Sequence, residues 1–231
     1  LLVGILRHPQ QTTESSLMNS FHSINKQIHL HHIDCMAYMA QFPDGYFELA
    51  IVDPPYGLPK TATHRRGKLK SRVLNTGCIQ RWDVKPEQVY FDELRRVAKH
   101  QIIWGGNYFD LPPTRGIIAW DKCQPWLNFS QVELAWTSFD KPAALFKHHN
   151  RTIGKIHPTQ KPIELYQWLL QRYAKQGDRI LDTHLGSGSS AIAAHQLGFE
   201  LHGTELDETY FMASVERFKR TTTQTEFEVT A

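Results

Sequence analysis

The amino-acid sequence predicts a doubly wound α/β domain built on a mostly parallel sheet, and three observations lead to this fold class. The chain has 231 residues, the length of one large domain. Hydrophobic residues make up 41% of it and charged residues 21%, as in ordinary globular proteins. Short apolar runs rich in β-branched residues alternate with segments of helical periodicity, and this alternation is typical of a parallel sheet covered by helices on both faces.

Seven short runs are the candidate strands. Each is mainly apolar, contains β-branched or aromatic residues and is bounded by polar or turn-forming residues. They are residues 28–33, 49–52, 101–104, 116–120, 132–136, 179–181 and 200–203.

The candidate helices lie between and after these strands. Pro86 and Pro162 stand where proline fits the first turn of a helix, and Gly198 stands where glycine ends one. The expected helices are residues 36–41, 86–97, 162–174, 189–197 and 208–220.

We expect one domain over residues 28–220, preceded by an N-terminal extension (1–27) and followed by a frayed polar tail (221–231). Residues 57–85 are basic, contain glycine and proline, and show weak periodicity. They are expected to form a loop or small insertion over the edge of the sheet.

Composition argues against several classes of protein. No apolar run reaches the roughly 18 residues of a transmembrane helix. The first six residues are apolar but lack a basic leader and a cleavage site, so we expect no signal peptide. Cys35, Cys78 and Cys123 are isolated thiols without C-x-x-C spacing, which favours a reducing, cytoplasmic compartment.

The histidines near the first strand have a spacing that resembles a metal site. On a strand, however, His29 and His31 share one face while His32 points to the other, and the thirteen histidines of the chain are scattered. From the sequence we therefore expect no metal.

Positive charge is concentrated in two segments. Residues 54–82 contain seven Lys or Arg and no acid, and residues 141–163 contain five and no acid, whereas the whole chain has a net charge of +3. An acidic body with two basic segments suits a polyanionic partner such as nucleic acid. Two solvated loops would produce the same pattern.

A glycine-containing turn joins a predicted strand to a helix at residues 180–194. Gly186 and Gly188 allow a sharp turn and let a ligand approach main-chain amides at the helix N-terminus. Glu205 ends the next strand, 23 residues after Asp182, an offset at which a carboxylate can accept hydrogen bonds from both ribose hydroxyls of a nucleoside cofactor. The pattern predicts nucleoside-cofactor binding. It lacks the G-K-[ST] of a phosphate-binding loop.

The second motif is Asp53-Pro54-Pro55-Tyr56, directly after an apolar strand. Asp53 can accept a hydrogen bond from an exocyclic amine, and the carbonyl of Pro54 can accept a second one. Pro55 stiffens the turn, and Tyr56 offers a face on which a planar ring can stack. The motif is typical of a site that binds a planar amine.

Together these motifs resemble the β-group of amino-methylating DNA methyltransferases, which use S-adenosylmethionine and place the catalytic motif before the cofactor motif. The likeness extends to residues 157–162 and 205–217, and so covers about residues 28–220. Strand-end segments at 104–109, 120–122 and 133–136 look like those of phage and prophage members. The family implies a Rossmann-like, mostly parallel sheet of seven strands, circularly permuted, in a bacterial or phage-infected cell.

The resemblance also implies roles for particular residues. Asp53 and the Pro54 carbonyl bind the amine of a flipped base. Pro55 completes the motif before Tyr56, which stacks on that base. The implied cofactor contacts are Asp34, Lys161, Asp182, Gly186, Gly188, Ser189, Glu205 and Leu206. The candidate DNA contacts are Lys60, Arg65, Arg66, Lys68, Lys70, Arg72 and Lys155.

The chain departs from the family at two points. The usual Asp-Pro-Phe is Asp182-Thr183-His184 here, and the usual Thr-Thr is Ser189-Ser190. An Asp at the start of the catalytic tetrapeptide favours adenine N6 over cytosine N4 in this family, and the expected substrate is adenine in double-stranded DNA.

Several alternatives stay open. They are a cytosine-N4 enzyme, an RNA- or protein-amine methylase, a nicotinamide-dependent oxidoreductase and a non-catalytic nucleic-acid-binding module. A second copy of the chain and a cognate restriction endonuclease are candidate partners, and no membrane is expected.

Overall fold

The computed structural model describes residues 19–57, 84–125, 130–150 and 155–229, apart from residues 24, 26 and 158. Within them one sheet of nine strands has the order β1-β2-β9-β8-β3-β4-β6-β5-β7. The strands are β1 (Ser20–His22), β2 (Ile28–His32), β3 (Phe47–Val52), β4 (Ala98–Trp104), β5 (Ile117–Asp121), β6 (Val132–Thr137), β7 (Ala144–Lys147), β8 (Arg179–Asp182) and β9 (Glu200–Glu205).

The centre of the sheet is parallel. Strands β2, β9, β8, β3 and β4 each pair in parallel with the next. β6 runs antiparallel to β4 and β5, whereas β7 pairs in parallel with β5, and β1 is antiparallel to β2. The carboxyl ends of five neighbouring strands therefore meet at one edge.

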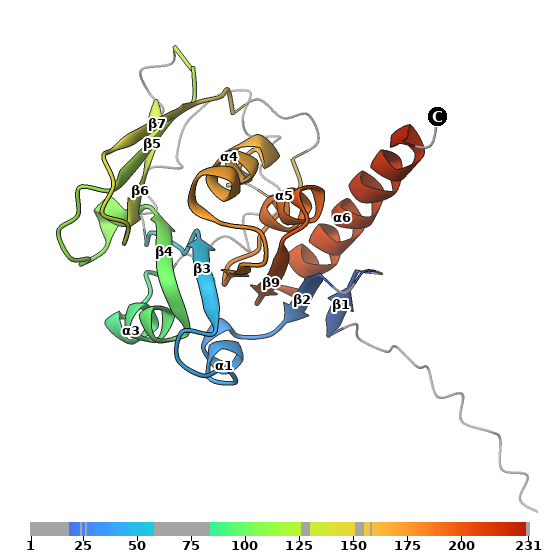
Figure 1. Cartoon of the computed structure of the whole chain (residues 1–231), viewed down its shortest axis with the longest axis horizontal. Coiled ribbons are helices and arrows are strands. Elements are labelled where there is room, and N and C mark those ends of the chain that lie inside the picture. The colour runs from blue at the N-terminus through green and yellow to red at the C-terminus, as the bar shows by residue number, and fades with distance from the viewer. Residues whose placement is uncertain are drawn as a thin grey trace, which may run out of the picture.

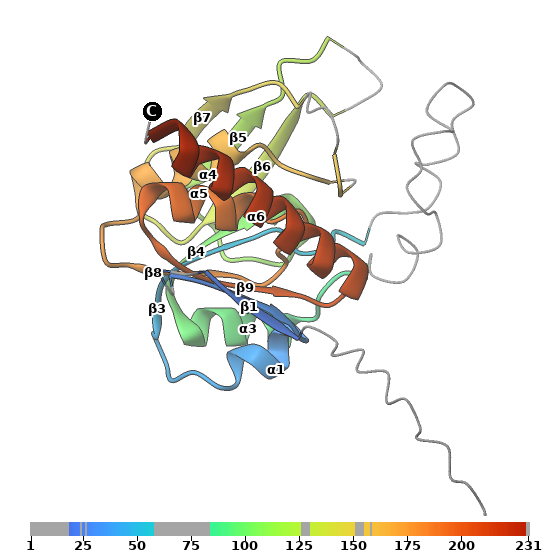
Figure 2. The ribbon, with the colours of Figure 1, turned by 90° about the vertical axis from the view of Figure 1, so that its right-hand side faces the viewer.

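Helices cover both faces of the sheet (Figures 1 and 2). The short α1 (Cys35–Met39) and α3 (Gln88–Val97) lie on one face, over a core that includes Phe47, Phe91 and Leu181. The other face carries α4 (Ile163–Tyr173), α5 (Ser189–Leu197) and α6 (Glu208–Val229), with Leu30 and Trp104 in the larger core. The predicted doubly wound fold is confirmed.

All seven predicted strands are present, and two were missed. β1 has three residues with polar ends, and β7 has four residues that are only half-buried or exposed, so neither has an apolar run long enough to recognise. The described sheet thus has nine strands rather than seven. Helix α6 was predicted to end near residue 220 but continues to Val229, through most of the segment expected to be frayed.

Among the described residues, no helix is both long enough and apolar enough to cross a lipid bilayer.

Candidate functional site

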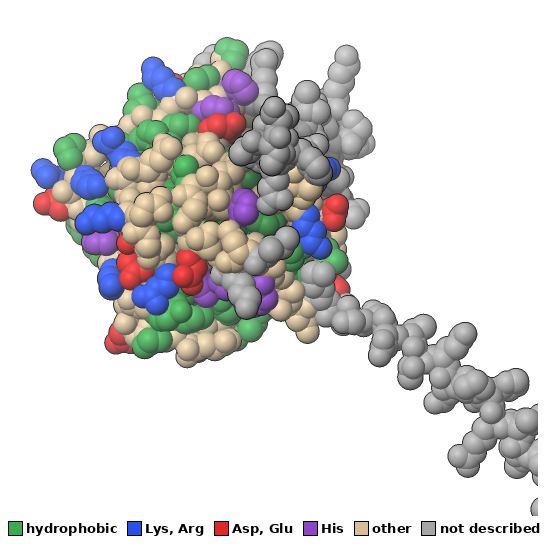
Figure 3. All heavy atoms as spheres, turned by 45° about the vertical axis from the view of Figure 1, so that its right-hand side comes forward, with side chains coloured by type: hydrophobic (Ala, Val, Ile, Leu, Met, Phe, Trp, Pro, Cys, Tyr) green, Lys and Arg blue, Asp and Glu red, His purple; other side chains and the backbone are tan. Residues whose placement is uncertain are grey.

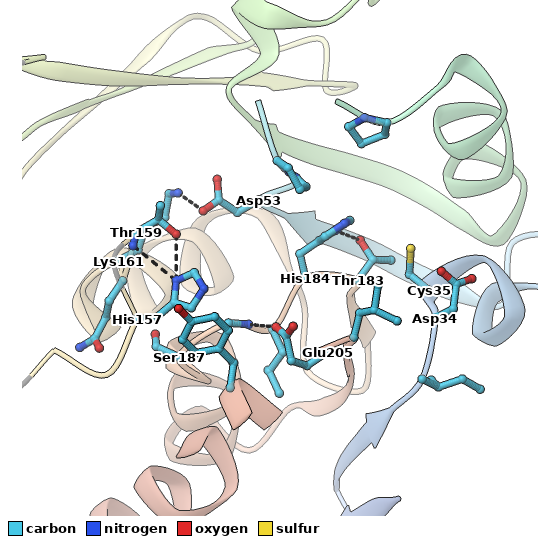
Figure 4. Close-up of a pocket in the computed structure, with 18 of the residues that line it drawn as sticks. Asp34, Cys35, Asp53, His157, Thr159, Lys161, Thr183, His184, Ser187 and Glu205 are labelled. Carbon is cyan, nitrogen blue, oxygen red and sulfur yellow. Dashed lines mark hydrogen bonds and ion pairs between the residues drawn. The ribbon is translucent and has the colours of Figure 1, made fainter. Parts of the chain in front are cut away.

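Four acidic residues stand at the carboxyl ends of neighbouring parallel strands. Asp34 and Asp53 come shortly after β2 and β3, and Asp182 and Glu205 are the last residues of β8 and β9. Ligand sites of open α/β sheets lie at this edge. A cavity of about 300 Å³ opens there (Figure 4), and its walls include Asp34, Asp53, Pro55, Lys161, Gly186, Glu205 and Leu206. The structure thus brings seven of the predicted site residues around one cavity.

Asp53 is held by two neighbouring side chains. The Tyr56 hydroxyl donates to Oδ1 at 2.6 Å, and the Lys161 ammonium contacts Oδ2. The Lys161 side chain is only 3% exposed, so its charge needs a buried counter-ion. The structure therefore fixes the orientation of this carboxylate before any ligand binds.

Lys161 also contacts a second carboxylate, that of Glu133 on β6, at 3.3 Å. Glu133 in turn pairs with Lys122 at 2.5 Å. Burial opposes both charges, but the opposite charges outweigh it: they raise the pKa of Lys161 and lower the pKa of Glu133. Carboxylates and ammonium groups alternate along this chain of contacts.

The opposite wall of the cavity is the glycine turn before α5. Gly186 has a φ of +50°, which glycine adopts without strain, and its amide donates to Oε2 of Glu205 at 2.9 Å. Oε1 of Glu205 accepts from the Asp207 amide at 3.0 Å. Burial raises the pKa of the Glu205 carboxyl, although backbone hydrogen bonds oppose that rise. Each carboxylate oxygen has a second lone pair with which to accept a ligand hydroxyl.

Asp34 and Leu206 lie at the rim of the cavity. Asp34 is the N-cap of α1, where Oδ1 accepts from the Ala37 amide at 3.0 Å. The Leu206 side chain is 65% exposed, and Ile33 also lines the cavity. The rim therefore combines apolar surface with one carboxylate, a suitable setting for a planar ring with a polar edge.

Three predicted cofactor residues lie beneath the cavity rather than on its wall. Buried Asp182 accepts from the Ser190 hydroxyl at 2.5 Å and from the His184 amide at 3.1 Å, and burial raises its pKa to about 7. Ser189 donates to the carbonyl of Lys161 at 2.8 Å, and Gly188, at φ +72°, is the N-cap of α5. In the structure these residues shape the turn, and Ser189 ties Lys161 to it.

The tetrapeptide at residues 53–56 follows the buried strand β3. Pro54 is buried, and Pro55 lines the cavity. The Tyr56 ring stacks on the ring of Tyr108, with centroids 5.0 Å apart and planes at 21°. A Cβ added at Gly105 would lie 2.2 Å from Cε1 of Tyr56, so only glycine lets the backbone pass this ring.

Several residues around the cavity were assigned no role from the sequence. His157 and His184 line it, and burial lowers the pKa of each ring to about 4. Thr183, at the departure from the family motif, hydrogen-bonds to His184 Nδ1 at 2.9 Å and to the Tyr90 hydroxyl at 2.6 Å. These partners satisfy the polar pair that replaces the family's apolar Pro-Phe. For Glu133, the sequence indicates only a place near the end of a strand and does not predict its contact with Lys161.

Most predicted DNA contacts fall where the structure gives no description. Lys60, Arg65, Arg66, Lys68, Lys70 and Arg72 lie outside the described residues. Lys155 is described, away from the cavity wall, and donates to Asn150 at 2.6 Å. On the face shown in Figure 3, the described Lys and Arg side chains are interspersed with acidic ones.

Comparison with known proteins agrees with the motifs. Residues 131–216 match the N6_N4_Mtase family, described as DNA methylase. YubD of Escherichia coli (strain K12) is 26% identical over 200 residues, which cover 80% of this chain and 87% of YubD. The type II methyltransferase M2.MboI of Moraxella bovis is 22% identical over 254 residues, covering 87% of this chain and 91% of that protein.

Two solved structures share the fold. M1.HpyAVI, in a complex with SAM, superposes with a TM-score of 0.53 at 17% identity, over 82% of this chain and 99% of that one. The cytosine-N4-specific PvuII DNA methyltransferase gives 0.57 at 15% identity, over 83% and 86%. At such low identity these likenesses concern the architecture alone.

Proposed function

We propose that this chain is a DNA methylase of the N6/N4 family, whose model matches residues 131–216. We propose further that it transfers a methyl group from S-adenosylmethionine to the N6 amine of a flipped adenine in double-stranded DNA. One observation carries the proposal. The Asp53 carboxylate shares a single cavity with Glu205 and Gly186, the residues expected to hold the nucleoside part of the cofactor.

The cavity residues fit S-adenosylmethionine. Glu205 has lone pairs left for both ribose hydroxyls, and Leu206 with Ile33 provides apolar surface for the adenine ring. Gly186 leaves room beside the turn, because a Cβ there would approach His157 only to 3.6 Å. About 300 Å³ lies within the range of small-molecule sites. When bound, the cofactor supplies a methyl group on a sulfonium, an electrophile that needs no metal.

The chain's own part in the reaction is to position the amine. The lone pair of a base amine is delocalised into the ring, so the amine is a weak nucleophile. Its N–H groups donate hydrogen bonds to Asp53 and to the Pro54 carbonyl. These bonds favour a more tetrahedral geometry at the amine nitrogen, in which the lone pair faces the methyl group. Lys161 and Tyr56 keep the Asp53 carboxylate in place, and we propose Lys161 as a positioning residue for it.

Stacking on Tyr56 would complete the base site. Tyr108, whose side chain is 42% exposed, stacks on this ring in the way proposed for a base. A paired base must first leave the helix, at a cost of a few kcal/mol. We propose that the basic insertion, residues 57–85, holds DNA phosphates while the base is out. We also propose that the chain acts in the cytoplasm and has a cognate restriction endonuclease as its partner.

The choice of adenine rests on Asp53. In the family that the sequence resembles, Asp at this position favours adenine N6 and Ser favours cytosine N4. Cytosine N4 is the second candidate, since the fold is shared with a cytosine-N4-specific enzyme.

The test is methyl incorporation from labelled S-adenosylmethionine into unmethylated double-stranded DNA. Asp53→Ala should lower incorporation by about 10²-fold or more, while the affinity for S-adenosylmethionine stays within about threefold of the wild type. Near-normal incorporation by Asp53→Ala would overturn the assignment of Asp53. Failure of the wild-type chain to bind S-adenosylmethionine would overturn the function itself.

A further inference from the structure

A group of histidines gathers on the sheet face that carries α1, away from the proposed active site. The antiparallel pairing of β1 and β2 places His22 beside His29, and the parallel pairing of β2 and β9 places His29 beside His202. Glu200 is two residues before His202 on the same strand, so its side chain lies on the same face. Three neighbouring strands thus contribute imidazole and carboxylate groups to one spot.

The potential ligand atoms are close enough to share an ion. One ligand atom from each of His29, Glu200 and His202 lies within 4.8 Å of the others. His202 Nε2 is 3.0 Å from Oε1 of Glu200, and Nδ1 of His22 is 2.8 Å from Nδ1 of His29. Ligands at roughly 2.0–2.1 Å from a tetrahedral zinc ion lie about 3.4 Å apart. Because the three atoms lie within 4.8 Å of one another, side-chain rotations that change their separations by about 1.4 Å or less would bring them to that spacing.

The surroundings prepare His202 for a metal. Its Nδ1 is 2.7 Å from the hydroxyl of buried Tyr38, which leaves Nε2 directed at Glu200. A hydrogen bond from one imidazole nitrogen commonly fixes the tautomer and orientation of a metal-binding histidine.

We propose that His29, Glu200 and His202 bind one divalent transition-metal ion, and Zn²⁺ is the probe that we would use. Two imidazoles and one carboxylate form a known zinc ligand set, with a fourth position for water. The ion would join β2 to β9, the strands that lead to Asp34 and Glu205 in the cavity. This site is independent of the proposed methyl transfer. The sequence predicts no metal because the histidine spacing within one strand does not form a ligand set, whereas Glu200 and His202 come from another strand.

The experiment is calorimetric titration of the metal-stripped, untagged full chain with Zn²⁺ at neutral pH. We expect one site per chain, and His29→Gln and Glu200→Gln should each weaken its affinity at least tenfold. His148→Gln is the matched control, because His148 also lies near another histidine and near Glu164 (3.9 Å) but on a different surface. It should leave the affinity unchanged.

Equal weakening by all three variants, or an affinity unaffected by His29→Gln, would overturn the proposal. If a variant does not fold, X-ray absorption spectroscopy of the Zn²⁺-loaded wild-type chain decides. A spectrum that shows two imidazole ligands, and otherwise only nitrogen or oxygen ligands, supports the site. A sulfur ligand, or no detectable imidazole, contradicts it.

Discussion

Removal of the Lys161 ammonium should destabilise the fold, because this charge is the buried counter-ion of Asp53. Lys161→Met keeps much of the side-chain volume but leaves Asp53 without its counter-ion and Glu133 with only Lys122. The Lys161 side chain is 3% exposed and that of Asp53 is 14% exposed. Loss of one partner from a buried ion pair costs about 3–5 kcal/mol. Because the Tyr56 hydroxyl still donates to Asp53, we expect about 3 kcal/mol.

Urea unfolding measures this cost. At a slope near 2–3 kcal/mol per molar urea, a loss of 3 kcal/mol lowers the unfolding midpoint by about 1–1.5 M. The double variant Lys161→Met/Asp53→Asn removes both charges of the pair and should recover part of that loss. Lys99→Met is the control, because Lys99 pairs with Glu48 at 3.2 Å but is 56% exposed, and it should cost less than about 1 kcal/mol. A Lys161→Met variant no less stable than Lys99→Met would show that Asp53 does not depend on this buried ion pair.

Three further changes have definite expected outcomes. Glu205→Gln should weaken S-adenosylmethionine binding about 10- to 100-fold in calorimetry, because a charged acceptor becomes a neutral one; an unchanged affinity would remove Glu205 from the site. Gly188→Ala should cost about 1–2 kcal/mol in urea unfolding, because φ is +72° and the new Cβ would lie 3.3 Å from Cβ of Ser214; a neutral effect would contradict this backbone geometry. Burial lowers the pKa of His157 from 6.5 in the unfolded chain to about 4 in the folded chain. Between these two values the unfolded chain binds the extra proton, so the stability that is fully present above pH 6.5 is lost as the pH falls toward 4. The loss is at most about 1.4 kcal/mol per pH unit. His157→Gln should therefore lose less stability than the wild type over this range, and an equal loss would argue against a buried neutral ring.

Much of the fold followed from the sequence because the central strands carry an unmistakable pattern. Residues 49–52, directly before Asp53, are all apolar and buried, as expected of a strand buried on both faces. Strand β7 escaped prediction because its four residues pair only with β5 at the sheet edge, so tertiary pairing rather than composition makes it a strand.

The site was predictable to the extent that motifs lie within short stretches of chain. Asp53 and Glu205 each follow an apolar strand, and parallel strands bring such positions to one edge. Glu133 could not be found in this way, because its contact with Lys161 joins residues 28 positions apart through the antiparallel strand β6. The Ser189 hydroxyl donates to the Lys161 carbonyl, 28 positions away in the chain, and only the packed structure reveals this partner.

Identification of the methylated nucleoside tests the proposed reaction, its cofactor and its substrate together. The wild-type chain would be incubated with methyl-labelled S-adenosylmethionine and unmethylated double-stranded DNA, which is then digested to nucleosides and analysed by mass spectrometry. We expect label in N6-methyladenine with the wild-type chain and none with Asp53→Ala. Label in N4-methylcytosine would contradict the choice of base, and no label in DNA from a chain that binds the cofactor would contradict the proposed substrate.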